Sequence, residues 1–432
     1  MNVTIAPSAL QGTVRAIPSK SQAHRLLLCA ALADGPTELI CSGTSEDIEA
    51  TVRCLTGLGA GIRRENGRFW VTPLDRTHPV SQAPLACGES GSTLRFLLPV
   101  VCALGTGGAF LPQGRLPQRP LSPLYEELTA HGCTLSKPGS VPFSCGGQLQ
   151  SGRYTLAADV SSQYVSGLLF ALPLLAGDSE LTLTGQVESR PYIDMTLHAL
   201  KAFGIAVRET GSGFSIPGGQ RYRSPGTVNV EGDWSNAAFW LCAGAIGEHP
   251  VTVTNLNTAS LQGDRACLAL LERFGARVKR SDDSVTVSGG DLRGLELDAK
   301  DVPDLVPVFA LVAAAAEGVT VIRNAGRLRL KESDRLKAVA ETLTALGAAV
   351  SEQPDGLVIR GGHPLSGGVV SSWGDHRIAM TAAIAAQCAG GPVTITGAEA
   401  VNKSYPDFYT HFRRLGGSVT EEATWHPSSE TI

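Results

Sequence analysis

Residues 302–360 read VPDLVPVFALVAAAAEGVTVIRNAGRLRLKESDRLKAVAETLTALGAAVSEQPDGLVIR. The pattern predicts a buried helix over Pro307–Glu317 and a strand over Val319–Arg323. An amphipathic helix over Glu332–Leu346 follows, with Gly347 as its C-cap, and then a hairpin over Ala349–Arg360. A helix that is apolar on every side has to be buried. One such segment therefore needs neighbours of the same kind to form a core.

The same pattern occurs six times along the chain, at intervals of roughly 70 residues, which is the signature of an internal repeat. Each copy opens with small, polar or charged residues immediately before an apolar helix. The openings are Lys20-Ser21-Gln22, Glu89-Ser90-Gly91-Ser92, Ser161-Ser162-Gln163, Gly232-Asp233-Trp234-Ser235, Val302-Pro303-Asp304 and Gly374-Asp375-His376-Arg377. A helix start carries unpaired N–H groups and the positive end of a dipole, so six such starts suit a highly charged anion.

Length and composition narrow the class of protein. A chain of 432 residues predicts two domains, and a net charge of −4 argues against a general nucleic-acid-binding protein. The ten cysteines form no C-x-x-C pair and lie mostly in apolar runs, which predicts buried free thiols in a reducing compartment. No apolar run reaches the roughly 18 residues of a membrane span, and Met1–Arg15 lacks the features of a secretory signal. We expect a cytoplasmic protein without a membrane or nucleic-acid partner.

The repeats predict a division into two halves of three copies each. One domain comprises residues 1–19 plus 227–432 and the other comprises residues 20–226, with hinges near 19–20 and 226–227. The segment Arg221–Gly226 is the best linker candidate between copies three and four. The strand near Val3–Ala6 precedes the first copy, and we expect it to pair with the second half.

Lys20 and Arg25 flank the start of the first apolar helix, for which Ser21 is the expected N-cap. Capping needs only the serine, and a solvated lysine is the simplest reading of Lys20. Two cations beside a positive helix end repel one another unless an anion joins them. The arrangement therefore favours an oxyanion ligand.

The fifth and sixth openings contain the same electrostatic conflict. In Lys331-Glu332-Ser333-Asp334-Arg335, the two acids suit a helix N-terminus but the two cations do not. Arg377 again lies at the end of a helix that disfavours positive charge. Lys403 and Arg119 are loop cations next to prolines, and each taken singly reads as a solvated residue.

Taken in order, these motifs resemble the EPSP synthase family, the enolpyruvyl transferases of the shikimate pathway. The motifs are Pro18-Ser19-Lys20-Ser21, Gly91-Ser92-Thr93-Leu94-Arg95, Arg119-Pro120-Leu121, Ser161-Ser162-Gln163, Ser189-Arg190-Pro191-Tyr192, Pro303-Asp304, Lys331-Glu332-Ser333-Asp334-Arg335, Gly374-Asp375-His376-Arg377 and Lys403-Ser404-Tyr405-Pro406-Asp407. The resemblance spans nearly the whole chain. It implies a two-domain inside-out α/β barrel, built from six βαβαββ units, with the active site in the cleft between the domains.

The resemblance also implies a reaction and its residues. The family transfers the enolpyruvyl group of phosphoenolpyruvate to the 5-hydroxyl of shikimate 3-phosphate and releases phosphate through a tetrahedral intermediate. The ligands that it implies for shikimate 3-phosphate are Lys20, Ser21, Arg25, Ser161, Ser162, Gln163, Ser189, Tyr192, Asp304 and Lys331. Those that it implies for phosphoenolpyruvate are Lys20, Gly91, Arg119, Gln163, Arg335, Arg377 and Lys403.

Three residues have an implied catalytic role. Asp304 is the expected base on the attacking hydroxyl, and Glu332, with Lys20 nearby, is expected to handle the proton on the methylene carbon. The resemblance implies no metal or organic cofactor, and a monomer whose partners are the two small-molecule substrates. The fourth opening, around Asp233 and Trp234, supplies no expected ligand.

The chain departs from the family pattern at two positions, and two alternative functions remain open. Glu89 and Arg327 stand where family members commonly carry Asn, so neither is taken as a ligand. The sister transferase that acts on UDP-N-acetylglucosamine usually has a cysteine in the loop that matches Gln113–Arg119, and this loop has none. A non-catalytic anion-binding scaffold would not need two acids such as Asp304 and Glu332.

Overall fold

The computed structural model describes residues 1–81 and 84–422, which fold as two compact units. Unit 1 consists of Met1–Ala16, Trp234–Thr258 and residues 266–422, and unit 2 consists of Ile17–Asp233 and Ala259–Arg265. Each unit contains three four-stranded sheets in the described part of the chain. The domain limits and hinges expected from the sequence stay a prediction.

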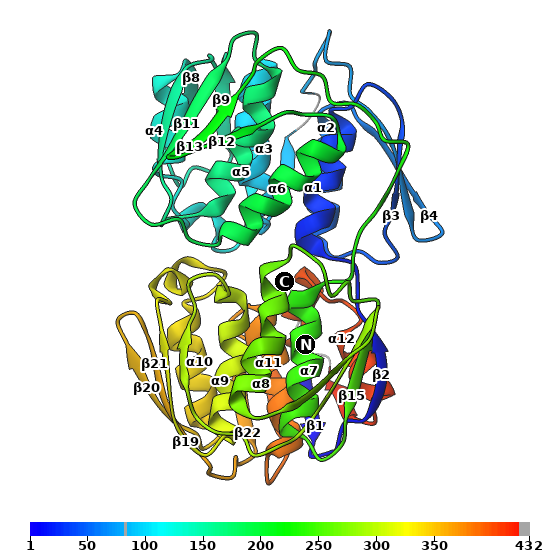
Figure 1. Cartoon of the computed structure of the whole chain (residues 1–432), viewed down its shortest axis with the longest axis vertical. Helices are drawn as coiled ribbons and strands as arrows, with labels where there is room; N and C mark the ends of the chain where they lie inside the picture. The colour runs from blue at the N-terminus through cyan, green and yellow to red at the C-terminus, as the bar shows by residue number, and fades with distance from the viewer. Residues whose placement is uncertain (82–83, 423–432) are drawn as a thin grey trace, which may run out of the picture. The chain divides into compact units, whose positions relative to one another are not determined.

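Three apolar helices form the inside of each unit. In unit 1 they are α7 (Trp234–Ile246), α9 (Val306–Ala315) and α11 (His376–Ala385), and in unit 2 they are α1 (Lys20–Ala31), α3 (Gly91–Leu104) and α5 (Ser162–Ala171). All ten residues of α11, from His376 to Ala385, are buried. In Figure 1, α7, α9 and α11 lie between strands of different sheets. The helices are therefore inside and the sheets outside, as the inside-out barrel predicts.

The second helix of each repeat is shorter or more amphipathic. These helices are α2 (Glu46–Gly57), α4 (Leu124–Ala130), α6 (Arg190–Ala202), α8 (Cys267–Phe274), α10 (Arg335–Ala345) and α12 (Phe408–Arg414). The elements predicted for the fifth repeat are confirmed, but some of their bounds differ. The buried helix is Val306–Ala315 and not Pro307–Glu317, and the C-cap of α10 is Leu346 and not Gly347. α10 begins at Arg335 and not at Glu332, because the side chain of Asp334 accepts a hydrogen bond from the backbone N–H of Lys337 and so caps the helix there.

The sheets of unit 2 have the strand orders β14-β3-β5-β4, β6-β7-β9-β8 and β10-β11-β13-β12. Their strands are β14 (Thr227–Asn229), β3 (Thr37–Ile40), β5 (Arg68–Thr72), β4 (Gly61–Glu65), β6 (Leu85–Gly88), β7 (Gly108–Pro112), β9 (Phe143–Gly147), β8 (Cys133–Leu135), β10 (Arg153–Ala157), β11 (Ser179–Thr184), β13 (Gly213–Ile216) and β12 (Arg208–Thr210). In each sheet the first two strands are parallel and the last two form an antiparallel hairpin. This is the arrangement of a βαβαββ unit.

The sheets of unit 1 have the orders β16-β17-β15-β2, β18-β19-β21-β20 and β22-β23-β1-β24, and each again combines one parallel outer pair with one antiparallel outer pair. In the first of these orders the parallel pair, β15 and β2, stands last, and in the third the antiparallel pair is β1 with β24, which are distant in the sequence and form no hairpin. Their strands are β16 (Arg277–Arg280), β17 (Ser284–Ser288), β15 (Val251–Thr254), β2 (Gly12–Arg15), β18 (Glu296–Asp298), β19 (Gly318–Arg323), β21 (Gly356–Gly361), β20 (Ala349–Gln353), β22 (Gly368–Ser371), β23 (Val393–Thr396), β1 (Asn2–Ala6) and β24 (Ser418–Glu422). β1 pairs with β23 and β24, so the expected pairing of the N-terminal strand with the second half is confirmed.

Two repeats obtain their first strand from a distant part of the chain. β2 lies parallel to β15 and completes the sheet of the fourth repeat, whereas β14 lies parallel to β3 and completes that of the first. The segment Arg221–Gly226, expected as a linker, contains Tyr222, whose fully buried hydroxyl donates to the carbonyl of Phe170. That segment is therefore packed into unit 2.

One short segment departs from the order of the repeats. Ala259–Arg265 belongs to unit 2, although the chain on both sides of it belongs to unit 1. Ser260 donates to Glu231 at 2.6 Å, and the side-chain amide of Gln262 donates to the carbonyl of Gly232 at 2.8 Å. These contacts hold the segment against Glu231 and Gly232 of the same unit.

Candidate active site

A buried guanidinium lies at the centre of the polar cluster in unit 1. Arg335, the first residue of α10, has a side chain only 1% exposed. It donates from Nη1 to Asp304 at 2.7 Å, from Nη2 to Glu332 at 2.8 Å and from Nε to Asp375 at 2.8 Å. Burial of this cation is tolerated because three carboxylates compensate it, and they raise the pKa of Arg335 against the lowering effect of burial.

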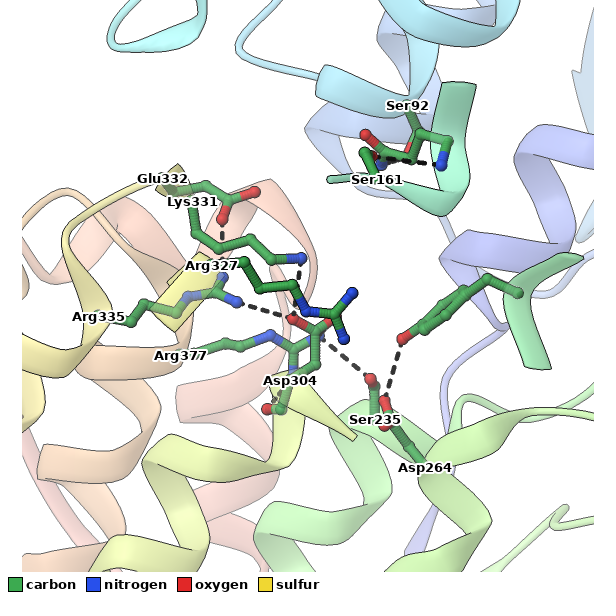
Figure 2. Close-up of polar contacts among 12 residues, drawn as sticks. Ser92, Ser161, Ser235, Asp264, Asp304, Arg327, Lys331, Glu332, Arg335 and Arg377 are labelled. Atoms are coloured by element: carbon green, nitrogen blue, oxygen red, sulfur yellow. Dashed lines mark hydrogen bonds and ion pairs between the residues drawn. The ribbon is translucent and has the colours of Figure 1, made fainter. Parts of the chain in front are cut away.

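Asp304 lies in the short helix η4 (Pro303–Leu305), surrounded by cations. Figure 2 shows it between Lys331, Arg335 and Arg377. Arg377 donates to Oδ2 at 3.1 Å and to the backbone carbonyl of Asp304 at 3.1 Å, and Nζ of Lys331 lies 3.8 Å from Oδ1. Burial alone would raise the pKa of Asp304, but the three cations outweigh it and hold this pKa well below its ordinary value.

Lys331 precedes α10 and is the least firmly charged member of this cluster. Burial lowers its pKa to about 8, while the negative charge of Asp304 opposes the shift and the positive charge of Arg335 adds to it. The lysine therefore changes charge in the range where enzymes are commonly assayed.

Lys403 and Arg327 lie in two further short helices of unit 1, η7 (Ala398–Lys403) and η5 (Gly326–Leu330). Nζ of Lys403 donates to the carbonyl of Gly374 at 2.6 Å, immediately before the Asp375 that binds Arg335. Arg327 donates to the carbonyl of Lys300. Lys403 is thus placed beside the turn that leads into α11.

In unit 2, Lys20 is the first residue of α1. The N-cap is Ser19, whose hydroxyl accepts from the backbone N–H of Gln22, so the prediction of Ser21 as the cap is wrong. Nζ of Lys20 lies 2.7 Å from the carboxylate of Asp47, and its backbone N–H donates to Asp233 at 3.0 Å. The carboxylate of Asp47 therefore already compensates the positive charge of Lys20, for which the sequence favours an external oxyanion as partner.

Arg25 links α1 to α6 inside unit 2. It donates to the carbonyls of Ser21 and Tyr192 at 2.6 and 2.8 Å and to the hydroxyl of Thr196 at 2.9 Å. Burial lowers its pKa to about 10. The hydroxyl of Tyr192 donates to Asp264 at 3.4 Å, so it has to leave that carboxylate before it can donate to another oxygen.

The start of α3 brings several predicted ligands together. A Cβ on Gly91 would lie 2.9 Å from Nη1 of Arg119 and 3.1 Å from Nη1 of Arg95. Arg95 donates to the side-chain carbonyl of Gln163 at 2.7 Å, and the amide nitrogen of Gln163 donates to Ser92 at 2.9 Å. The orientation of the glutamine amide is therefore fixed from both sides.

The remaining predicted ligands occupy helix starts. Ser161 is the N-cap of α5, and its hydroxyl accepts from the backbone N–H of Gln163 at 3.3 Å, while Ser162 is the first residue of the helix. Ser189 precedes α6 with a φ of 53° and a side chain that is buried. A non-glycine residue in the left-handed region is uncommon and often marks a functional position.

The sequence did not identify the carboxylates that compensate the cations. Asp47 lies in the acidic first turn of α2, where it reads only as a favourable charge at a helix start. Asp375 caps α11 by accepting from the N–H of Arg377, and it also accepts from Arg335 and Ser333. Arg95 was quoted as part of a motif, but nothing in the sequence indicated its contact with Gln163.

Two general features of the described residues, 1–81 and 84–422, concern metals and membranes. No group of three or more His, Cys, Asp or Glu side chains among them is arranged to hold a metal ion. None of their helices combines the length and apolarity that crossing a membrane requires.

All ten cysteines are free, and nine of them are buried, which confirms the expectation of buried thiols.

Replacement of Asp375 by Ala should destabilise unit 1, because it leaves the charge of Arg335 buried with one carboxylate fewer. Breaking a buried ion pair costs about 3–5 kcal/mol. The free energy of unfolding can be followed by tryptophan fluorescence, since the buried Trp234 and Trp240 both belong to unit 1. Glu272→Ala is the control, because it removes an exposed pair with Arg280 worth about 1 kcal/mol at most. Equal losses in the two variants would contradict the account.

Comparison with known proteins matches the chain to one family over nearly its whole length. The family model described as EPSP synthase (3-phosphoshikimate 1-carboxyvinyltransferase) matches residues 5–412. The chain is 43% identical over 424 residues to a 3-phosphoshikimate 1-carboxyvinyltransferase from Clostridium kluyveri, which covers 97% of this chain and 98% of the relative. A corresponding protein from Clostridium acetobutylicum is 42% identical over 424 residues, with the same coverage of both chains.

Solved structures agree with this match. EPSP synthase from Acinetobacter baumannii is 27% identical, with a TM-score of 0.81 and coverage of 97% of this chain and 100% of that one. The enolpyruvyl transferase NikO from Streptomyces tendae is 20% identical, with a TM-score of 0.74 and coverage of 97% and 98%, and shares the fold. The repeats, the ordered motifs and these matches lead to one conclusion: the chain belongs to the EPSP synthase family.

Proposed function

We propose that this chain transfers the enolpyruvyl group of phosphoenolpyruvate to the 5-hydroxyl of shikimate 3-phosphate and releases phosphate, the reaction of its family in the shikimate pathway. One observation carries the proposal most directly. Asp304 and Glu332 are two acids joined through Arg335 and bordered by Lys331 and Arg377. Proton transfer at two different atoms needs two such groups, and anionic substrates need the cations.

The proposed ligands carry the charge that the substrates require. The two substrates together bring two phosphates and two carboxylates. We assign shikimate 3-phosphate to Lys20, Ser21, Arg25, Ser161, Ser162, Gln163, Ser189, Tyr192, Asp304 and Lys331. We assign phosphoenolpyruvate to Lys20, Gly91, Arg119, Gln163, Arg335, Arg377 and Lys403. In this proposal the domains formed by residues 1–19 plus 227–432 and by residues 20–226 contribute ligands to the same pair of substrates.

Asp304 is proposed as the base that takes the proton of the 5-hydroxyl. Its low pKa without substrate makes it a weak base, because Arg335 and Arg377 stabilise its charge. When substrate anions share these two cations, that stabilisation weakens and the pKa of Asp304 rises. The carboxylate would therefore become a stronger base when the substrate that needs it is bound.

Glu332 is proposed to move the proton at the methylene carbon, with Lys20 as the accompanying catalytic cation. In the addition step the hydroxyl oxygen bonds to C2 of phosphoenolpyruvate, and C3 gains a proton. In the elimination step C3 loses a proton, the C2–C3 double bond re-forms and phosphate leaves from C2. Glu332 lies 2.8 Å from Nη2 of Arg335, which fixes the position of its carboxylate.

We further propose that the protein works as a monomer in the cytoplasm. Every proposed ligand comes from a single chain, and free buried thiols suit a reducing compartment. UDP-N-acetylglucosamine remains the second acceptor to be tested, and the absence of cysteine from residues 113–119 disfavours it.

The function is tested by phosphate release from phosphoenolpyruvate with each acceptor. We expect release with shikimate 3-phosphate and none with UDP-N-acetylglucosamine or with no acceptor. Asp304→Ala and Glu332→Ala should still bind shikimate 3-phosphate but lose turnover by about three orders of magnitude, the scale of a lost general acid or base. Release with the nucleotide sugar would overturn the substrate assignment, and normal turnover in either variant would overturn its role.

Affinity for shikimate 3-phosphate should fall as the pH rises through about 8. The pKa of Lys331 is about 8, so the lysine is charged below that pH and progressively neutral above it, whereas the substrate phosphate stays a dianion. Lys331→Arg keeps the positive charge at all of these pH values and should remove the fall. The measurement is calorimetric titration between pH 7 and 9. A flat profile in the unmodified protein, or the same fall in Lys331→Arg, would refute this role.

A further inference from the structure

The fourth repeat carries none of the residues proposed to bind the substrates, yet one of its side chains directly contacts such a residue in another repeat. Ser235 is the second residue of α7, at the opening of that repeat. Its hydroxyl oxygen lies 3.1 Å from Nη2 of Arg377, a proposed ligand of phosphoenolpyruvate. Figure 2 shows Arg377 and Ser235 approaching the region of Asp304 from opposite sides.

The contacts of Arg377 divide its donors between two partners. Nη2 donates to Oδ2 of Asp304 and to Ser235, each at 3.1 Å, and Nη1 donates to the backbone carbonyl of Asp304 at 3.1 Å. The side chain is only 4% exposed. A guanidinium is a rigid planar fork, so acceptors on two sides of Nη2 fix the plane of the whole group.

The two partners differ in what happens during the reaction. Asp304 is the proposed base, so its carboxylate has to turn to the substrate hydroxyl and take up a proton. At that moment it holds Arg377 less firmly. Ser235 is neutral and takes no part in proton transfer, so its contact with Nη2 can persist. It also occupies one N–H without placing a negative charge next to the incoming anion.

We propose that Ser235 is a positioning residue, which holds the guanidinium of Arg377 in the orientation that binds phosphoenolpyruvate while Asp304 engages the acceptor. The inference rests on the proposed function, because it takes Arg377 as a ligand of that substrate. It adds a residue from the one repeat to which no role was assigned.

The test compares Ser235→Ala with Ser235→Thr in the full chain. Ala removes the hydroxyl and suits the first turn of a helix, whereas Thr keeps it. We expect Ser235→Ala to raise the KM for phosphoenolpyruvate about tenfold, the scale of one hydrogen bond to a charged group. The dissociation constant of shikimate 3-phosphate and the unfolding midpoint should not change, and Ser235→Thr should restore the KM to within about twofold.

Two further variants separate positioning from a loss of structure. Ser260→Ala removes a different serine hydroxyl of the same repeat, a buried one that donates to Glu231, and should leave the KM for phosphoenolpyruvate unchanged. In an Arg377→Lys background, which lacks the fork, Ser235→Ala should add little further effect.

The outcomes distinguish this inference from the proposed function. If the unmodified protein releases phosphate with shikimate 3-phosphate but Ser235→Ala has a normal KM for phosphoenolpyruvate, only the inference is overturned. Equal losses in Ser235→Ala and Ser260→Ala, or full additivity with Arg377→Lys, would also overturn it. Absence of turnover in the unmodified protein would overturn the proposed function itself.

Discussion

The structure of unit 1 around its polar cluster depends on one buried guanidinium. Arg335 is almost inaccessible to water and contacts Asp304, Glu332 and Asp375, which come from three separate segments of the chain. Leaving any of these charges buried without its partner would cost several kcal/mol, so the segments hold one another in place. Asp375 is fully buried and also caps α11, so it ties the helix that carries Arg377 to the helix start that carries Arg335.

The same arrangement explains how Asp304 can be kept ionised without substrate. Neighbouring cations lower the pKa of Asp304, and the negative charges lower the cost of burying Arg335. Substrate anions compete for these cations, so binding and proton transfer are electrostatically linked. In unit 2 the pair between Lys20 and Asp47 has the same character, because a carboxylate holds the charge of a proposed substrate ligand.

Periodicity in the sequence was sufficient to predict six repeats, each with an apolar helix, a strand, a capped helix and a hairpin, whereas the inside-out barrel that they form was implied by the family resemblance. It could not predict that β2 and β14 complete sheets of other repeats, since strands of four and three residues carry no information on their partners. Helix starts were displaced where another residue made the cap, as Ser19 and Asp334 do. The contacts of Asp47, Asp375 and Ser235 join residues distant in sequence, so no local pattern indicates them.

The central claim is that Asp304 competes with the substrate for Arg335 and Arg377 and also acts as the base. It is tested most directly by the dissociation constant of phosphoenolpyruvate for Asp304→Asn, measured by equilibrium dialysis with shikimate 3-phosphate at saturation, beside the turnover number. The account predicts that turnover collapses while phosphoenolpyruvate binds as tightly as in the unmodified protein or more tightly. Weaker binding in proportion to the lost turnover would contradict it.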